Sequence, residues 1–205
     1  MRPARVPALD FDDDSEDELF GAHWRETATE LAGGSYDYKY ATLFDLIEAA
    51  KGKKNALIVA LDHITDAGNM GALLRSAEVV GALGALIPNK RSAPVNEAVY
   101  RTSAGAVEHL KVAREANLAN SLLRLKEEGF WIAGATEHAE QDIWHAPLEG
   151  RLVIVMLAED TGLSRSLRDT CDFEFKLPRR GVTQSLNVAQ AFTAIAYEWL
   201  RRTEG

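Results

Sequence analysis

Residues 56–88, "ALIVALDHITDAGNMGALLRSAEVVGALGALIP", decide the fold of this chain. The stretch begins with an apolar run over 56–62, continues with a helical pattern over 69–81 and ends with a second apolar run over 82–88. Two short apolar runs joined by a helix of this length predict a strand–helix–strand unit, and parallel strands need such a long crossover. The residues therefore favour a parallel sheet that is buried on both faces.

The same alternation of apolar strands and amphipathic helices continues along the chain. Further strands are predicted over 109–114, 130–135, 151–158 and 173–178, and further helices over 41–52, within 95–105, over 117–129 and from Val188 onward. This alternation predicts the α/β class, with a mostly parallel sheet flanked by helices on both faces. Ligands of such sheets bind outside the carboxyl ends of the strands, so the segments that follow strands are the candidate sites.

The first part of the chain has a different character. Residues 1–36 combine prolines, an acidic run over 10–18 and the sequence "AGGS", with little hydrophobic periodicity. We expect an acidic, flexible N-terminal arm with a helical turn around 19–31. One regular domain, large enough for a hydrophobic core, is predicted over 37–205.

The formal net charge of −8 does not exclude a nucleic-acid partner, because seven of the acids lie in the run 10–18. The remainder of the chain is close to neutral and carries its basic residues in pairs. Such pairs are usually solvated surface, and they indicate nucleic-acid binding only where the fold gathers them on one face. The pairs are Lys53-Lys54, Lys90-Arg91, Arg179-Arg180 and Arg201-Arg202.

Several classes of protein are disfavoured by composition. No secretory segment opens the sequence, and the longest apolar run, 152–158, is too short to cross a bilayer. The single cysteine, Cys171, cannot form an internal disulfide, which favours the reducing cytoplasm. The five histidines show no metal-ligand spacing, so we expect no metal site and no membrane association. No GxGxxG or P-loop pattern follows a predicted strand, which counts against a standard dinucleotide or nucleoside-triphosphate site.

Three segments place polar or small residues directly after apolar strands. In the first segment, 62–77, Asn69 opens a helix, Gly71 allows a close approach and Arg75 follows nearly two turns later. The alternative interpretation is an Asp or Asn helix cap followed by a surface arginine. In the second segment, 157–162, Glu159 and Gly162 follow a buried strand, and the alternative is an acidic helix N-terminus.

The third segment, 177–188, lies between the last predicted strand and the last helix. It contains a Pro-Arg-Arg-Gly turn followed by Ser185, Leu186 and Asn187. Asn187 with Gln190 resembles a capping box, so this segment alone is explained equally well as a helix cap. The order and spacing of all three segments together are more specific than any one of them.

In that order and spacing the chain resembles the SpoU/TrmH branch of the SPOUT superfamily. The branch has the motifs D-x-x-x-D-P-x-N-x-G-x-x-x-R-x-A, G-x-E-G-x-G and I-P-x-x-G-x-x-x-S-L-N-V, which correspond here to 62–77, 157–162 and 177–188. The stretches 90–114 and 117–135 are similar to those of the members that 2′-O-methylate a guanosine of large-subunit rRNA. The resemblance covers about residues 40–202.

The resemblance implies an activity, a cofactor and a fold. Members of the family transfer a methyl group from S-adenosyl-L-methionine to a ribose 2′-hydroxyl of RNA. They tie the C-terminal segment into a deep trefoil knot, which is otherwise very rare in proteins. They act as homodimers with the active site at the interface. The apolar stripe Val188, Ala191, Phe192, Ile195 and Trp199 would suit a dimer interface, and it would equally suit an ordinary core.

The resemblance also implies how the cofactor is held. In the family, main-chain groups of the knot loops cradle it, and an adenine edge can be recognised by amide and carbonyl groups without special side chains. Carried over to this sequence, the cofactor-binding positions are Ala135, Thr136, Leu157, Gly162, Leu177 and Leu186.

For the reaction itself the resemblance points to Arg75, which we expect to clamp an RNA phosphate and to stabilise the developing 2′-oxyanion. Asn69 would orient Arg75 or the ribose, and Glu159 would hold Arg75 or loop amides in place. Ser185 and Asn187 would fix the ribose and the loop. The residues expected to contact the RNA backbone are Lys90, Arg91, Arg179 and Arg180.

Two departures from the family pattern matter most. Ala67 replaces a proline, which is a mild loss of loop rigidity. Leu157 replaces a glycine, and a side chain there would press on the methionine moiety of the cofactor. The alternative function is therefore a non-catalytic RNA-binding or ribosome-assembly protein with the same knotted fold and impaired cofactor binding. An unrelated nucleotide-binding α/β domain is a third alternative, and the absent phosphate loop counts against it.

Overall fold

A computed structural model describes residues 36–157, 162–183 and 185–204 of the chain. The helical turn expected around 19–31 and the candidate residue Glu159 lie outside the described residues. The chain divides into two units, Met1–Asp37 and Tyr38–Gly205, and every helix and strand below belongs to the second unit.

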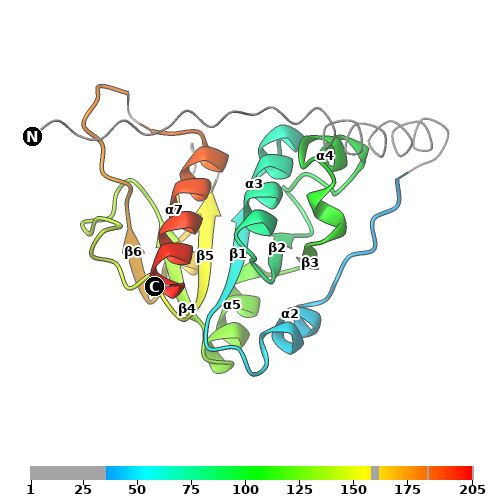
Figure 1. Ribbon diagram of the computed structural model, residues 1–205, viewed down its shortest axis with the longest axis horizontal. Coiled ribbons are helices and arrows are strands. Elements are labelled where there is room, and N and C mark those ends of the chain that lie inside the picture. The colour runs from blue at the N-terminus through cyan, green and yellow to red at the C-terminus, as the bar shows by residue number, and fades with distance from the viewer. Residues whose placement is uncertain (1–35, 158–161, 184, 205) are drawn as a thin grey trace, which may run out of the picture. The chain divides into compact units, whose positions relative to one another are not determined.

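The centre of this unit is a six-stranded sheet in the order β3-β2-β1-β5-β4-β6 (Figure 1). Every pair of neighbouring strands is parallel, which confirms the predicted α/β class with a parallel sheet. The strands are β1 (Ala56–Asp62), β2 (Gly84–Pro88), β3 (Lys111–Glu115), β4 (Trp131–Ala135), β5 (Arg151–Leu157) and β6 (Phe173–Phe175).

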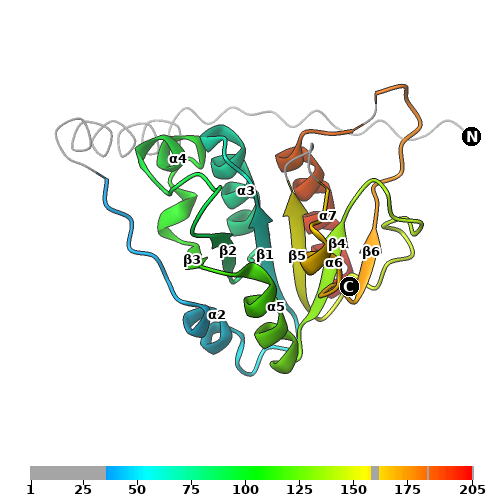
Figure 2. The same cartoon turned by 180° about the vertical axis from the view of Figure 1, so that it is seen from behind.

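Helices cover both faces of the sheet, as the sequence predicts. Helices α3, α4 and α7 lie on the face seen in Figure 1, and α2, α5 and α6 lie on the face seen in Figure 2. The periodicity does not predict the short helix α6. The helices are α2 (Leu43–Ala50), α3 (Ala67–Val79), α4 (Glu97–Thr102), α5 (Leu118–Glu127), α6 (Arg165–Arg168) and α7 (Val188–Thr203), with a 3₁₀ turn at Ala106–Glu108.

Side-chain caps determine where two of these helices begin. Thr42 caps α2 in a reciprocal capping box: its hydroxyl accepts from the Asp45 N–H, and the Asp45 carboxylate accepts from the Thr42 N–H at 2.8 Å. Asp66 caps α3 by accepting a hydrogen bond of 2.7 Å from the Asn69 N–H. Asn69 therefore lies within the first turn of α3, and the expectation that it opens the helix is wrong by two residues.

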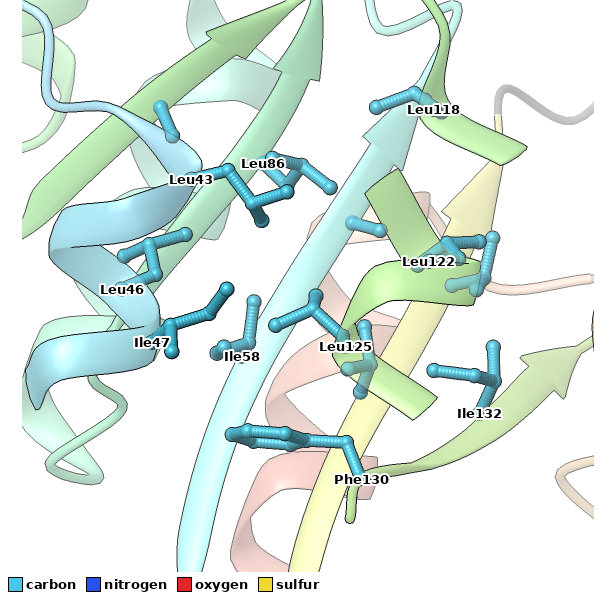
Figure 3. Packing of buried hydrophobic residues seen from close by; sticks show 14 of the residues in the cluster. Leu43, Leu46, Ile47, Ile58, Leu86, Leu118, Leu122, Leu125, Phe130 and Ile132 are labelled. Carbon is cyan, nitrogen blue, oxygen red and sulfur yellow. The ribbon is translucent and has the colours of Figure 1, made fainter. Parts of the chain in front are cut away.

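One hydrophobic cluster fills the space between the sheet and helices α2, α5 and α6 (Figure 3). Ile58 of β1 and Leu86 of β2 lie between Leu46 of α2 and Leu122 of α5, and none of the four has solvent-exposed surface. Burying one such side chain stabilises the fold by about 1.5–3 kcal/mol. This packing holds the strands in register, so that their carboxyl ends form one edge.

On the other face, α3 packs between α4 and α7. Gly71 of α3 lies against Thr102 of α4, and a Cβ atom at Gly71 would overlap the Thr102 side chain. The close approach expected at this glycine is thus made by a neighbouring helix. Across the other side of α3, the Ser76 and Thr193 hydroxyl oxygens are 2.7 Å apart, which ties α3 to α7.

The apolar stripe of α7 belongs to the core of its own chain. Val188, Phe192, Ile195 and Trp199 are each less than 10% exposed. The suggestion that this stripe forms a dimer interface is therefore wrong, and the alternative of an ordinary core is confirmed. Any interface on this face must use the outer surfaces of α3 and α7.

Candidate functional site

A cavity of about 950 Å³ lies at the carboxyl ends of β4, β5 and β6. Its floor is apolar, because Met156 and Phe175 border it from the sheet and Val188, Ala191 and Ile195 border it from α7. Its rim consists of the loops that follow the three strands, which is where parallel sheets bind ligands. The volume is within the range of small-molecule sites.

All the residues predicted to bind the cofactor lie on the wall of this one cavity. They come from three separate segments of the chain that the topology brings together. The residues are Ala135, Thr136, Leu157, Gly162, Leu177 and Leu186. Ser185, predicted to fix the ribose, lines the same cavity.

Main-chain groups on this wall differ in whether they are free to bind a ligand. The Thr136 N–H donates to the Phe175 carbonyl at 3.0 Å, so this amide is already used within the sheet. Leu177 and Leu186 use neither their N–H nor their C=O in hydrogen bonds to other residues that the structure describes. Gly162 has a φ of 59°, which favours glycine, and open space surrounds the position of a Cβ atom.

The sequence predicts that the Leu157 side chain presses on the cofactor, but most of this side chain points away from the cavity. Side chains alternate along a strand, so Leu157 lies on the same face of β5 as Val153 and Val155. Both valines belong to the hydrophobic cluster under α5, and half-buried Leu157 packs against that cluster. Only part of the leucine side chain can therefore border the cavity.

A hydrogen bond joins the first and third motif segments. The Asn187 side-chain amide donates to the side-chain oxygen of Asn69 at 2.8 Å, across 118 positions of sequence. The Asn187 side-chain oxygen accepts from the Ala189 N–H at 2.9 Å and so caps α7. The helix cap expected of Asn187 is thus confirmed, and its expected role in fixing the ribose and the loop stays a prediction.

Arg75 is not brought to this asparagine pair within one copy of the chain. Six residues separate it from Asn69 on α3, which is about 240° around the helix. Asn69 faces α7, whereas Arg75 is exposed and makes no hydrogen bond or ion pair with another described residue. Of the two roles expected of Asn69, orienting Arg75 is not met within one copy of the chain, and orienting the ribose stays a prediction.

The candidate RNA contacts fall into two pairs at the same edge of the sheet. Lys90 and Arg91 are exposed in the loop after β2, and the Arg91 guanidinium contacts the His63 ring. Arg179 and Arg180 are exposed in the loop after β6, and Arg179 borders the cavity. Both loops follow the carboxyl ends of parallel strands.

The model for the SpoU rRNA Methylase family matches residues 56–197. The chain belongs to this family. The match includes the three motif segments and all the residues that border the cavity, so the family resemblance inferred from the motifs is confirmed.

Relatives within and around the SpoU family agree with this assignment. The 23S rRNA (guanosine-2′-O-)-methyltransferase RlmB of Photobacterium profundum is 38% identical over 160 residues, which are 78% of this chain and 65% of the relative. The SpoU methyltransferase AviRb from Streptomyces viridochromogenes, solved in complex with the cofactor AdoMet, is 27% identical with a TM-score of 0.70. That comparison covers 77% of this chain and 64% of AviRb.

A third relative widens the range of RNA substrates in the family. The A. aeolicus TrmH/SpoU tRNA modifying enzyme is 27% identical with a TM-score of 0.66, over 79% of this chain and 82% of that one. By contrast, the chain spans just under two thirds of the length of RlmB and of AviRb.

Some residues that border the cavity were not predicted from the sequence. Arg168 of α6 borders it and lies 3.0 Å from the Glu174 carboxylate. Lys176 follows β6 and borders it too. Lys176 escaped because the strand was predicted to run on to residue 178, whereas Arg168 lies on the helix that periodicity missed.

Other features of the SpoU-family chain bear on the remaining predictions. Burial raises the pKa of the Cys171 thiol to about 12, so this cysteine is not a reactive nucleophile. Within the described ranges no group of three or more His, Cys, Asp and Glu side chains could hold a metal ion, and the metal-free site stays a prediction. None of the described helices is long and apolar enough to span a membrane.

Proposed function

We propose that this chain uses S-adenosyl-L-methionine to methylate a ribose 2′-hydroxyl in RNA, with a guanosine of large-subunit rRNA as the favoured target. The observation that carries the proposal is the single cavity whose wall contains every described cofactor candidate, beside the Asn69–Asn187 pair. Membership of the SpoU family and the activity for which RlmB is named support the same reaction. The regular domain, 37–205, would carry it.

The cavity fits the cofactor. Its apolar floor suits an adenine ring, and the main-chain groups of Leu177 and Leu186 supply donors and acceptors for the edge of that ring. Gly162 leaves space where any side chain would project toward the loop. When bound, the cofactor supplies an electrophilic methyl group on a sulfonium. AviRb, which binds AdoMet, shares this fold.

The residues of the chain would supply positioning and charge. Ser185 on the cavity wall and the Asn69–Asn187 pair would hold the ribose, since reacting groups held in line need little further help. Arg75 would bind the neighbouring phosphate through its planar fork and stabilise negative charge that develops on the 2′-oxygen. Glu159 is proposed to steady the loop that follows β5.

A homodimer would explain why Arg75 lies apart from the cavity. The outer surface of α3 and α7 carries Arg75 together with Val79 and Tyr197, which are 57% and 50% exposed. A two-fold interface applies the same surface from both copies, so it could bring Arg75 of one copy to the cavity of the other. Leu186, which is 51% exposed at the start of α7, would be covered by the same contact.

A trefoil knot in the C-terminal segment is proposed as well. After β6, at the edge of the sheet, the chain returns past β4 and β5 to reach α7, which packs against α3 (Figure 1). Such a return passes the loops at the carboxyl ends of β4 and β5. Stretching the chain mechanically from both ends tests this idea, because a knotted chain extends to less than its full contour length.

Lys90, Arg91, Arg179 and Arg180 would bind the RNA backbone on either side of the target nucleotide. Each pair is exposed at the carboxyl edge of the sheet, one beside β1 and the other beside the cavity. Phosphate contacts make affinity fall with salt, so RNA binding by this chain should weaken steeply between 50 and 200 mM salt.

The experiment that tests the function has two steps. Calorimetric titration with S-adenosyl-L-methionine measures cofactor binding, and transfer of a tritium-labelled methyl group into rRNA and tRNA transcripts measures the reaction. We expect saturable binding at one site per chain and transfer that disappears when the target ribose is 2′-deoxy. If the cofactor does not bind, the alternative of a non-catalytic RNA-binding protein is favoured. The presence of Leu157 on the cavity wall is the reason for that alternative.

A further inference from the structure

Two residues after neighbouring strands adopt a backbone conformation that side chains disfavour. His63 follows β1 with a φ of 58°, and Arg91 lies in the loop after β2 with a φ of 60°. Left-handed backbone in residues other than glycine is uncommon, and it persists only where the surroundings enforce it. Here the two residues also contact each other: Arg91 Nη1 lies 3.3 Å from His63 Nε2.

These contacts place the His63 ring between two charged side chains. A guanidinium can only donate, so Nε2 faces Arg91 as the acceptor. The other nitrogen, Nδ1, is buried and lies 2.9 Å from the Asp62 carboxylate, without the alignment of a regular hydrogen bond. Asp62, His63 and Arg91 therefore form a chain of contacts through the imidazole ring.

The loop that carries Arg91 is held firmly around this contact. The Ala93 N–H donates to the Ile64 carbonyl at 2.8 Å, and the Val95 N–H donates to the Tyr40 hydroxyl at 2.9 Å. Arg114 donates to the Asn89 carbonyl at 3.0 Å from the neighbouring strand. The loop is thus tied on both sides of Arg91, while the Arg91 side chain itself is exposed.

The position of this chain of contacts connects it to the cavity. Asp62 pairs with Leu157 across the β1–β5 ladder, and Leu157 lies on the cavity wall. Strands in a sheet are about 4.8 Å apart, so the ends of β2 and β5 are separated by roughly 10 Å. His63, within the first motif segment, therefore holds Arg91 at the carboxyl edge of the sheet, on the side of β1 away from the cavity.

We propose that His63 is a positioning residue, which fixes the Arg91 guanidinium so that it binds a phosphate next to the target nucleotide. The inference rests on the proposed RNA methyl transfer. The affinity of Arg91 for the phosphate would increase, because an arginine side chain already held in one orientation loses less conformational freedom when the phosphate binds. His63 does not contact the RNA in this proposal, and its effect passes through Arg91.

The test compares His63→Gly, Arg91→Ala and the double variant in methyl transfer to an rRNA transcript. Glycine accepts the left-handed backbone, so His63→Gly removes the ring without forcing the loop to change. We expect KM for RNA to rise about threefold for His63→Gly and about tenfold for Arg91→Ala, with kcat unchanged. In the Arg91→Ala background the histidine substitution should have no further effect. Arg91→Ala should also lower the salt slope of binding by about one.

Ala104→Gly is the matched control, because Ala104 has a φ of 52° in the turn after α4, and its N–H donates to the Arg101 carbonyl within the same turn. It relieves the same kind of backbone strain, and KM should not change. If His63→Gly lowers the melting temperature relative to the control, His63→Asn replaces it, since asparagine also tolerates this backbone.

The two hypotheses fail in different ways. A wild-type chain without methyl transfer overturns the proposed function. A wild-type chain that methylates RNA, with His63→Gly or His63→Asn leaving KM unchanged, overturns the positioning role. Equal effects of the histidine substitution with and without Arg91 overturn it as well, because the ring would then act independently of the guanidinium.

Discussion

The loops at the carboxyl edge of the sheet differ between its two halves. Beside β1, β2 and β3 the loops are tied to their neighbours: the Ala93 N–H donates to Ile64, and the Thr102 hydroxyl donates to the Ala67 carbonyl at 2.9 Å. Beside β5, β4 and β6, the loop 177–187 is exposed along most of its length, and Val182 is fully exposed. It joins the first half through the Asn187–Asn69 hydrogen bond.

This difference teaches how the site divides its tasks. Groups that align a reaction must be held closely, because a small displacement costs rate. Groups that admit and release a cofactor need a region that opens at low free energy, and such regions have few buried contacts. The first half of the edge therefore suits the positioning of RNA and Arg75, and the second half suits the cofactor. Changes in the two halves should separate rate from cofactor affinity.

The largest effect should come from Arg75→Ala. We expect methyl transfer to fall by about 10²–10³, the usual cost of one preorganised donor at developing negative charge. Cofactor affinity should stay nearly unchanged, because Arg75 does not border the cavity of its own chain and, in the proposed dimer, would bind the RNA phosphate and not the cofactor. The measurement is label transfer into rRNA fragments together with calorimetric titration. Arg75→Lys should restore little activity, since an ammonium lacks the planar fork. Substantial turnover by the alanine variant would place the chemistry elsewhere.

Hydrogen exchange of backbone amides measures directly how easily the loops beside β5, β4 and β6 open. In the free protein, the amides of Leu177, Gly181 and Leu186 should exchange faster than those of Ala93 and Val95, which donate hydrogen bonds. A cofactor concentration a hundredfold above Kd should slow the first group by up to about 100-fold. The second group should hardly respond. Equal protection of both groups would show that the two loops are not differently held.

The opposite end of α7 offers a contrast in pH dependence. Glu198 is 8% exposed, and its pKa is lowered to about 2, first by the hydrogen bond from Arg201 and then by that from Arg202. Arg202 also donates to the carbonyls of Ile143, Trp144 and Ala146, which anchors that segment to the helix. This end of α7 is tied, unlike the loop at its start.

Because the pKa in the folded chain is below the ordinary value near 4.5, the stabilisation is complete above pH 4.5 and is lost as the pH falls toward 2. We expect Glu198→Gln to lower the free energy of unfolding by about 1–2 kcal/mol at pH 7, allowing for solvent around Arg201, and by much less near pH 2. Urea unfolding at both pH values measures it. A loss that is independent of pH would argue against the ion pairs as its cause.

Much of this architecture follows from the sequence, and the reasons are local. Strands and helices were predictable because their apolar residues repeat at periods of two and 3.6. The cap at Asn187 was predictable because its short polar side chain reaches the first turn. Helix α6 was not predicted, because Arg165–Arg168 is too short to show a helical periodicity.

What could not be predicted depends on the whole fold. The stripe of α7 shows one apolar face, and periodicity does not say whether that face packs against its own chain or another. The hydrogen bond between Asn69 and Asn187 requires the sheet order that places α3 beside α7. The left-handed backbone at His63 and Arg91 has no sequence signal, because most residues with these side chains avoid it.

The smallest effect should come from Leu157→Gly. The leucine borders the cavity at its upper end, and overpacking of a ligand site typically costs about 1–3 kcal/mol. Most of its side chain packs against the cluster with Val153 and Val155, so we expect cofactor affinity to rise by less than about tenfold. The melting temperature should fall, because that packing is lost. Titrating both proteins with cofactor measures the difference, and Met156→Leu, which keeps the volume, is the control. Equal or weaker binding by the glycine variant would show that the strand end already accommodates leucine, and the second half of the edge would then bind cofactor without the family glycine.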